Sequence, residues 1–452
     1  MIVAVTGACG NLASAILPRL VARADVERVI GLDLRAPRHP ISGVEYRTAD
    51  VTKPDIAKHL AIDALFHLAF VVMGSESDVE RTERINIGGT RNVITAAIEA
   101  GVGHITYASS IAAYGAHRSN VGVTLSEDAP LRGNRDFAYS RTKADVEQWI
   151  ESIESASKAP PIARMRPSAF LASRGRGAGL LRGPLFPVLS GADYPSHLTH
   201  QDDVADAFVR AFVRRASGPF NVATRDPLPG SQWPAQLGKR ALPIPRVAMS
   251  ALELAFRAGI VPVDTALLRF GEAGPINVTA ERARRELGWR PRFATTAEVL
   301  RELGNTSTSR ASVQTKVIFG AMAEITRWRG GLPVPADRAT ELRSFAGAVD
   351  IILGGERPSS WHLIIGRDRI GVGRGRAPQA RAAVRLDENV LFELLSGELA
   401  YPVATMTGLL RFSGDAGMSM LIGGFFTQLG RAVRGDGSTA LPDFVRRWLL
   451  QR

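Results

Sequence analysis

The sequence predicts a doubly wound parallel α/β sheet, followed by a second and smaller α+β domain. Three observations lead to this prediction. The chain has 452 residues, which is enough for two or more domains that each bury a core. Roughly its first 300 residues alternate β-branched runs with segments of helical spacing, a pattern typical of parallel sheets. Beyond a polar stretch, consecutive strand-like runs are followed by helices, which is typical of an α+β domain.

The first thirteen residues form the motif that organises the chain. Residues 1–5 are a short apolar run that predicts a buried strand, and helical spacing begins at Asn11 after a tight turn. Gly7 permits the turn and Gly10 lets a pyrophosphate approach the free amides of the helix N-terminus. We therefore assign Gly7, Gly10, Asn11 and Leu12 to cofactor binding. A plain strand-turn-helix is the alternative, because one glycine motif is weak evidence of a nucleotide.

A second predicted strand, 28–32, ends at Asp33. An acid at this place accepts hydrogen bonds from the adenosine ribose hydroxyls and repels a 2′-phosphate, so it favours NAD over NADP. Arg35 acts in the opposite direction, because a guanidinium pairs with a 2′-phosphate. The sequence thus predicts NAD as the cofactor, with Arg35 as the residue that opposes this choice.

Further strands and helices alternate along the chain as a parallel, doubly wound sheet requires. The predicted strands are 44–47, leading to a strand end at Asp50 and Val51, then 64–69 and 104–108, with a helix over 86–100.

The residues after the strand 104–108 carry the candidate chemistry. Ser110 follows that strand, while Tyr139 and Lys143 open a helix and share one of its faces at i and i+4. A free phenol has a pKa of about 10, and a nearby ammonium and a nicotinium ring favour the phenolate. Tyr139 then serves as base in oxidation or acid in reduction, Ser110 holds the substrate oxygen, and Lys143 also binds the nicotinamide ribose. The alternative is a solvated surface pair, which Tyr-x-x-x-Lys alone does not exclude.

These residues resemble the extended short-chain dehydrogenase/reductase family, the group of NAD-dependent epimerases/dehydratases and 3β-hydroxysteroid dehydrogenases. The resemblance implies a Rossmann-type fold with a small substrate subdomain, NAD as cofactor and, in many members, a homodimer through helices 86–100 and 139–152. The matching positions are Thr6-Gly7-x-x-Gly10-x-x-Ala13, Asp33, Asp50-Val51, His67-Leu68-Ala69, Asn86-x-x-Gly89-Thr90, Tyr107-Ala108-Ser109-Ser110, Tyr114-Gly115, Tyr139-x-x-x-Lys143, Arg166-Pro167 and 200–205.

The resemblance also assigns site residues. Asp50 and Val51 contact the adenine, Leu68 to Phe70, including Ala69, line the cofactor, and Asn86 lies on the cofactor side. Phe70 departs from the family pattern, which has small residues there. Asn86 has an alternative role as the cap of the helix that follows it. His200 to Asp203 shape the loop before a helix, and Cys9 is a small loop residue.

Two segments of the N-terminal half each have two alternative roles. Arg174, Arg176 and Arg182 lie where the family places a substrate loop, and they either hold a nucleotide diphosphate or face solvent. The apolar segment 247–258 forms either a lid or ordinary core. The segment 277–289 is similar to the closing segment of the same family.

We expect a domain boundary in the polar stretch after residue 305, with domains 1–305 and 313–452 and the linker 306–312. Beyond a helix over 313–329, strand-like runs lie at 349–353, 360–365, 370–372, 381–386 and 408–412, with a helix over 388–397.

Residues 349–429 resemble the sterol carrier protein 2 family, chiefly over 384–399 and 406–421. The resemblance implies a sheet covered by helices on one face, with an apolar tunnel for sterols or acyl chains. Each proposed tunnel residue has ordinary core packing as its alternative role. Those residues are Leu395, Leu399, Met406, Met418, Met420, Phe425 and Phe426.

Composition excludes several classes of protein. The net charge of +12 comes largely from scattered arginines without interleaved aromatics, so we expect a solvated basic surface and no nucleic-acid partner. One cysteine excludes an internal disulfide. No uncharged apolar run approaches the ~20 residues of a membrane helix, and residues 1–5 enter a strand without a signal peptide. The C-terminal Leu450-Gln451-Arg452 is no peroxisomal address, so a cytoplasmic setting is the expectation.

Three functions remain for the whole chain. The first is an NAD-dependent oxidoreductase acting on the hydroxyl or ketone of a lipid or sterol-like substrate, which the carrier domain holds or delivers. The second is a nucleotide-sugar epimerase or dehydratase with an unrelated appended domain. The third is a lipid-binding protein whose dehydrogenase half only senses nucleotide. Intact Ser110, Tyr139 and Lys143 argue against the third, and the fused carrier half favours the first over the second.

Overall fold

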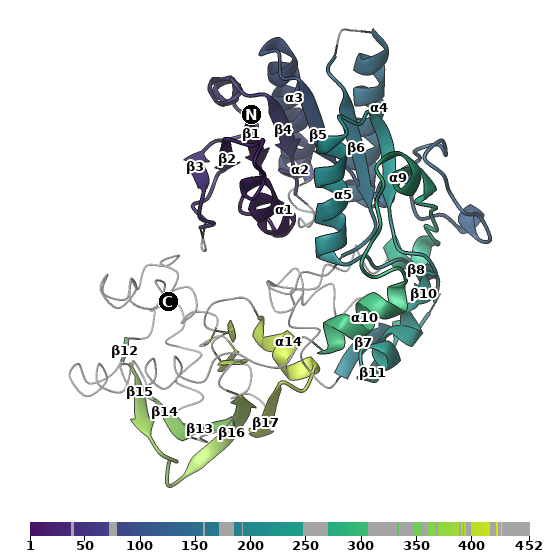
Figure 1. Cartoon of the computed structure of the whole chain (residues 1–452). Coiled ribbons are helices and arrows are strands. Elements are labelled where there is room, and N and C mark those ends of the chain that lie inside the picture. Colours follow the sequence, from purple (N-terminus) through teal and green to yellow (C-terminus); the bar gives the residue numbers. More distant parts are fainter. Residues whose placement is uncertain are drawn as a thin grey trace.

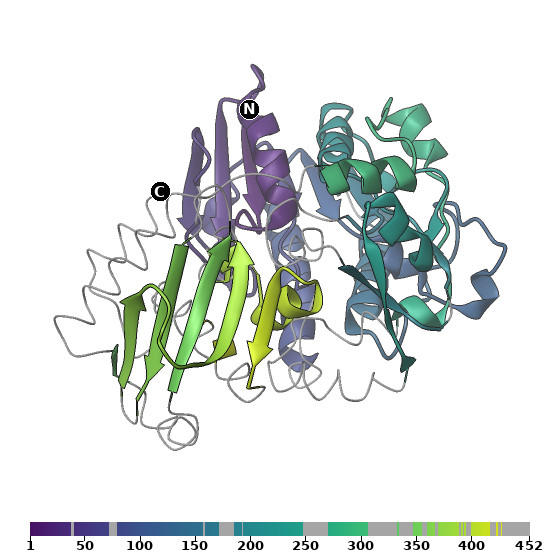
Figure 2. The same ribbon diagram turned by 90° about the horizontal axis from the view of Figure 1, so that it is seen from below.

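The structure, a computed structural model, forms two units that we describe separately (Figure 1). The first unit contains a parallel sheet with its helices, and the second contains a mixed sheet (Figure 2). The described residues are 1–37, 40–71, 79–156, 159–170, 185–191, 193–246, 270–305, 332–333, 347–354, 359–366, 369–387, 390–391, 393–394, 399–415, 422–423 and 426.

The sheet of the first unit has the strand order β3-β2-β1-β4-β5-β6-β9, and every neighbouring pair is parallel. The order reverses at β1, where β2 continues the sheet on one side and β4 on the other. Ligands of open α/β sheets bind at this switch point, outside the carboxyl ends of the strands. The strands are β1 (Ile2–Thr6), β2 (Arg28–Asp33), β3 (Val44–Thr48), β4 (Ala64–His67), β5 (His104–Ala108), β6 (Ile162–Pro167) and β9 (Gly218–Val222).

Helices cover both faces of this sheet, because successive strand residues point to opposite sides. Val3 and Val5 of β1 belong to the cluster that includes α1 (Asn11–Val21) and α5 (Gln201–Val213). Ala4 belongs to the cluster of the other face, with α3 (Thr90–Glu99) and α4 (Ala138–Ala156). The predicted doubly wound parallel sheet is therefore confirmed.

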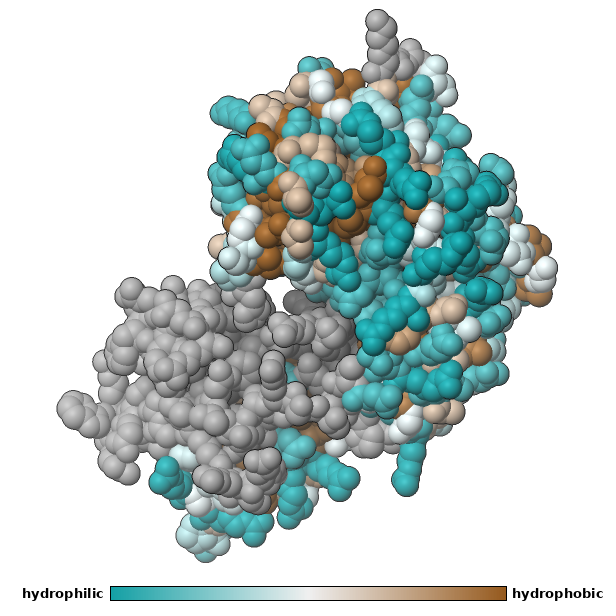
Figure 3. Space-filling view, viewed as in Figure 1, coloured by the Kyte–Doolittle hydropathy of each residue, from teal (hydrophilic) through white to brown (hydrophobic). Residues whose placement is uncertain are grey.

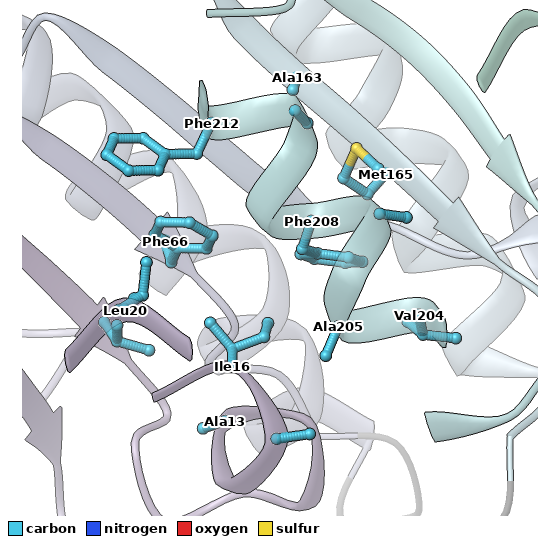
Figure 4. Packing of buried hydrophobic residues seen from close by; sticks show 14 of the residues in the cluster. Ala13, Ile16, Leu20, Phe66, Ala163, Met165, Val204, Ala205, Phe208 and Phe212 are labelled. Atoms are coloured by element: carbon cyan, nitrogen blue, oxygen red, sulfur yellow. The ribbon is translucent and has the colours of Figure 1, made fainter. Parts of the chain in front are cut away.

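The face between α1 and α5 is packed with fully buried apolar side chains. Ile16 and Leu20 of α1 lie in one cluster with Phe208 of α5, and Phe66 of β4 and Phe212 make an edge-to-face pair with ring centroids 5.5 Å apart (Figure 4). Burying one such side chain contributes about 1.5–3 kcal/mol relative to leaving it exposed. This packing fixes α1, and with it the turn that precedes α1, against the sheet.

A small subdomain follows the sheet, as predicted. It joins β7 (Leu185–Leu189) in parallel to β11 (Arg240–Ile244) and β8 (Pro195–Ser196) antiparallel to β10 (Leu228–Pro229). The helix α10 (Thr296–Asn305) packs against these strands, whereas α9 (Glu281–Glu286) packs on the main sheet. Hydrophilic side chains predominate around both helices in Figure 3. Arg174, Arg176, Arg182 and the segment 247–258 lie outside the described residues.

The second unit has the strand order β12-β15-β14-β13-β16-β17, in which β13 and β16 are parallel and the other pairs antiparallel. Its apolar cluster covers one sheet face and includes the helix α14 (Tyr401–Met406), as the predicted α+β domain requires. The strands are β12 (Leu332–Pro333), β13 (Gly347–Gly354), β14 (Ser359–Ile365), β15 (Arg369–Arg374), β16 (Ala380–Asp387) and β17 (Leu410–Gly414).

Two of the proposed tunnel residues, Leu399 and Phe426, are buried in this cluster, while Met406 is partly exposed. Residues 390–391 and 393–394 of the predicted helix 388–397 are helical. Among the described residues, no helix combines the length and the apolarity that crossing a membrane requires. The predictions for 306–312, 313–329, Leu395, Met418, Met420 and Phe425 fall outside the described residues.

Candidate active site

The turn between β1 and α1 requires glycine at position 7. Gly7 has a φ of +69°, and a Cβ there would lie 2.8 Å from the backbone of Ala69, in the loop after the neighbouring strand β4. Gly10 caps α1, and the first amide bonded within the helix is that of Ser14, which donates to the Gly10 carbonyl at 3.1 Å. The amides of Asn11 and Leu12 precede it, and such first-turn amides have no partner within a helix. The turn therefore presents free donors to an anion.

Asp33 ties this turn to the end of β2. Its carboxylate accepts from the Cys9 amide at 3.0 Å and from the Arg35 amide at 3.1 Å, one oxygen to each. Each carboxylate oxygen has a second lone pair, so a ribose hydroxyl can still be accepted. The Arg35 guanidinium lies 3.6 Å from Asp33, and its side chain is 75% exposed.

The predicted adenine contacts continue beside Asp33. The Ala49 amide donates to the Asp33 carbonyl at 3.1 Å, which places the next two residues next to the end of β2. Asp50 accepts from the backbone amide and the hydroxyl of Thr52, at 2.9 and 2.7 Å, and so closes a turn. The Val51 carbonyl accepts from Asn92 of α3 at 2.8 Å.

The loop after β4 is fixed by hydrogen bonds to β1. The Leu68 amide donates to the Thr6 carbonyl at 3.2 Å, and the Ala69 amide lies 3.4 Å from the Thr6 hydroxyl. His67 lies between the Thr6 and Thr90 hydroxyls, 2.7 and 3.1 Å away. Burial lowers the pKa of His67 to about 3, so this histidine is a neutral structural link at physiological pH.

Asn86 does not cap the helix that follows it, so the alternative role considered for this residue is wrong. It is fully buried in a π-helical turn, Arg84–Gly89, and α3 begins after Gly89. Its side-chain amide donates to the Val71 carbonyl at 3.0 Å and accepts from the Val71 amide at 2.8 Å. Asn86 thus holds the end of the loop that carries Leu68, Ala69 and Phe70.

Ser110, Tyr139 and Lys143 come together at the carboxyl end of β5. Ser110 begins a 3-10 turn, where its hydroxyl accepts from the Ala112 amide at 3.1 Å, and the Ser140 hydroxyl of α4 donates to the Ala112 carbonyl of that turn at 2.6 Å. The Lys143 ammonium donates to the Ala108 carbonyl and lies 5.8 Å from the centre of the Tyr139 ring. Phe70 joins this group: its ring is edge-to-face with Tyr139, at 5.8 Å between centroids, and 3.2 Å from the ammonium.

Burial dominates the protonation of both groups. It raises the pKa of Tyr139, which the hydrogen bond from Ser110 opposes. It lowers the pKa of Lys143 well below its usual range, which the negative charge of Glu147 opposes. The site therefore holds a phenol that burial keeps protonated, next to a buried amine whose charge depends on its surroundings.

Sequence reasoning missed Glu147, which lies one turn beyond Lys143 on the same face of α4. Its carboxylate is fully buried and accepts from the Ser109 hydroxyl and, at 2.6 to 3.0 Å, from the Arg166 guanidinium of β6. Arg166 also donates to the Tyr114 hydroxyl at 2.7 Å. The repeat of Tyr139, Lys143 and Glu147 at four-residue spacing was the available signal.

Each of the two units matches a known protein family. Residues 3–223 match the model of the NAD dependent epimerase/dehydratase family, and residues 332–427 match that of the SCP-2 sterol transfer family. An uncharacterized protein of Mycobacterium tuberculosis is 26% identical over 311 residues, which are 65% of this chain and 81% of that protein. The predicted cofactor NAD is thus confirmed at the level of the family.

Two solved structures share the fold of the first unit. One is a short-chain dehydrogenase/reductase superfamily protein from Agrobacterium tumefaciens with bound NAD, with a TM-score of 0.53 and 19% identity over 68% of this chain and 96% of that chain. The other is DesIV, the dTDP-glucose 4,6-dehydratase of Streptomyces venezuelae, with a TM-score of 0.53 and 18% identity over 68% of this chain and 96% of that chain. With these findings, residues 3–223 form a domain similar to those of the NAD dependent epimerase/dehydratase family, and residues 332–427 form a domain similar to those of the SCP-2 sterol transfer family.

Proposed function

We propose that the protein is an NAD-dependent oxidoreductase that acts on a hydroxyl or ketone of a lipid or sterol-like molecule, which the C-terminal domain binds or delivers. The observation that carries the proposal is the convergence of Ser110, in the turn after β5, with Tyr139 and the buried Lys143 of α4, on the edge of the sheet that also carries the glycine turn. The family matches of both domains support the same conclusion.

Each residue of the group has one task. When bound, NAD supplies the hydride acceptor, and NADH the donor, at the nicotinamide ring. Ser110 holds the substrate oxygen and donates to the phenol oxygen, while Tyr139 removes the substrate proton in oxidation or returns it in reduction. Lys143 binds the nicotinamide ribose, and its charge favours the phenolate.

The residues at the switch point fit the dinucleotide. The positive φ of Gly7, with no room for a Cβ, and the free first-turn amides of Asn11 and Leu12 suit a pyrophosphate. Asp33 suits the adenosine ribose, with Asp50 and Val51 beside it for the adenine. We assign Leu68, Ala69 and Phe70 to the cofactor wall, and Asn86 to the support of that wall through Val71.

Asp33 is expected to make NAD bind at least tenfold more tightly than NADP, a difference of about 1.4 kcal/mol. A 2′-phosphate would meet the carboxylate, and Arg35 already lies 3.6 Å from that same group. Replacing Asp33 with alanine removes both the ribose acceptor and the repelling charge, so the ratio of the two dissociation constants should fall. Titration of protein fluorescence with each dinucleotide measures both constants, and equal affinities in the wild type would contradict the expectation.

A nucleotide-sugar epimerase or dehydratase is the second candidate. It is supported by the solved dTDP-glucose 4,6-dehydratase that shares the fold. The SCP-2 domain favours a lipid substrate, because a nucleotide sugar needs no apolar carrier. Extraction of the purified chain, followed by mass spectrometry, distinguishes the two: bound lipid supports the first function and a bound nucleotide sugar the second.

We place the domain boundary at 306–312 and expect a cut there to leave two folded fragments. Among the described residues, the buried cluster of the second unit contains only residues from Val349 onward, and those of the first unit contain none beyond Leu303. The N-terminal fragment, residues 1–305, should keep NAD binding and turnover of a small soluble alcohol. Its efficiency on a sterol or long-chain alcohol should fall, because the tether that supplies about millimolar local concentration is gone.

Steady-state assays of the cut and intact chains on one soluble and one lipid alcohol measure this effect. The isolated C-terminal fragment should bind a fluorescent sterol or acyl probe. Equal efficiencies of the cut and intact chains on both alcohols would show that the C-terminal domain contributes nothing to the turnover of either substrate.

A further inference from the structure

The three donors of the Lys143 ammonium are all taken by protein groups. Nζ donates to the Ala108 carbonyl and lies 3.5 Å from the Tyr107 hydroxyl, both on the side of β5. The remaining side faces the Phe70 ring, whose centroid is 3.2 Å away, a close cation–π contact. An ammonium has three donors, and Lys143 is only 2% exposed, so the ring covers the last direction that is open to a ligand.

The backbone on both sides of Phe70 is held in place. On one side, the Ala69 amide lies 3.4 Å from the Thr6 hydroxyl of β1. On the other, both backbone polar groups of Val71 are hydrogen-bonded to Asn86. The ring can therefore leave the ammonium by rotation about its own two side-chain torsions, without a shift of strand or helix.

We propose that the Phe70 ring and a ribose hydroxyl of the dinucleotide are alternative ligands of the Lys143 ammonium, so that Phe70 sets the affinity for the nicotinamide half of the cofactor. This inference rests on the proposed function, which gives Lys143 the nicotinamide ribose. A hydroxyl oxygen accepting from Nζ needs a heavy-atom distance of about 2.7–3.2 Å, which is the space that the ring occupies. The two ligands exclude each other.

The exchange has a physical reason. A buried ammonium with an unpaired donor carries the full cost of its desolvation, and the negative face of an aromatic ring offsets a fraction of that cost. An aliphatic side chain at the same position would give no such compensation. Each cofactor molecule must replace this contact, so the observed affinity is lower than the ribose contact alone would give.

The test uses the full chain and two ligands, NADH and AMP. AMP has the adenosine half only, so it reports on the Asp33 end of the site and never meets Lys143. Phe70→Ala and Phe70→Leu should each bind NADH about three- to thirtyfold more tightly than the wild type, the range that corresponds to one buried cation–π contact. AMP affinity should stay within about twofold in both variants. NADH fluorescence and calorimetry measure the constants.

Two controls accompany these variants. Phe70→Tyr keeps the aromatic face and should bind NADH like the wild type. Phe412→Leu changes a half-buried phenylalanine of the second unit and should leave both affinities unchanged. A melting curve of each variant shows that it is folded, and Phe70→Leu keeps most of the apolar volume if Phe70→Ala loses stability.

Three results would overturn the inference. NADH affinity that stays equal or falls in Phe70→Ala and Phe70→Leu would show that the ring lines the site without competing with the ribose for Lys143. Tighter binding in Phe70→Ala alone would show that bulk, and not the aromatic face, competes. A wild-type chain that binds AMP but no NADH, and gains none in either variant, would overturn the proposed function together with the inference.

Discussion

Replacing Tyr139 with phenylalanine is expected to lower turnover by about 10²–10⁴-fold, the range that a general acid–base group contributes. The substitution keeps the ring and its edge-to-face contact with Phe70, and removes only the hydroxyl that exchanges the proton. The dissociation constant of NAD should stay nearly unchanged, because the effect falls on the chemical step. The measurement is kcat on the secondary alcohol that the wild type oxidises fastest, chosen from a panel that includes 3β-hydroxysterols.

Tyr46→Phe is the matched control. The Tyr46 hydroxyl accepts from the Ile41 amide at 3.3 Å, and β3 lies at the opposite end of the strand order from β6 and β9. It should keep full turnover. A Tyr139→Phe enzyme that retained more than about half of its turnover would show that another group transfers the proton.

Removing the Glu147 carboxylate should have the largest effect on stability. Its side chain is fully buried and that of Arg166 is 3% exposed, so solvent does not screen the pair. Glu147→Leu leaves the Arg166 charge buried without its main partner, which is expected to cost about 3–5 kcal/mol of unfolding free energy. The Ser109 hydroxyl loses its acceptor as well, so the strand end that leads to Ser110 should also loosen.

The double variant Glu147→Leu, Arg166→Met separates the charge pair from general core damage. With both charges replaced by apolar groups, much of the lost stability should return, because the desolvation cost of both ions disappears. Denaturation is followed with and without NAD, since only the transition of the N-terminal domain shifts with a ligand of that domain. If the double variant loses as much unfolding free energy as the two single variants lose together, then the shape of the side chains, and not their charge, determines stability at this position.

The sequence predicted the order of elements in the first unit because its parallel strands are buried on both faces. Such strands are short apolar runs, and 28–32, 64–69 and 104–108 each became a strand within one or two residues of the predicted ends. The helix 86–100 was predicted as one element, but it begins with a π turn. Its cause is tertiary, since Asn86 turns inward there to bind Val71.

In the second unit, the sequence predicted the strands but not their arrangement. Period-2 patterns identify a strand and its buried face, whereas the parallel pairing of β13 with β16 depends on contacts between residues about thirty positions apart. The helix α14 was missed, although Pro402 at its first turn is a recognised start signal. Strand 408–412 begins at Leu410, because residues 407–409 form the turn after that helix, with Gly408 at a φ of +73°.

The site was predictable as a set of residue types, and less so as a set of contacts. Spacing placed Tyr139 and Lys143 on one face, and the same rule extended by one turn would have reached Glu147. The position of the Phe70 ring was not predictable, because side-chain direction in a loop follows from the fixed neighbours Ala69 and Val71. The roles of the site residues stay predictions until the variants are measured.

Cys9, the single cysteine of the chain, lies inside the glycine turn, where its amide binds Asp33. Burial, with the Asp33 charge beside it, raises the pKa of its thiol to about 11. Only the thiolate reacts with peroxides, disulfides and alkylating agents, and near pH 7 almost none of this thiol is ionised. Cys9 is therefore expected to react slowly with oxidants and alkylating agents at neutral pH, although it lies in the turn that we assign to the cofactor.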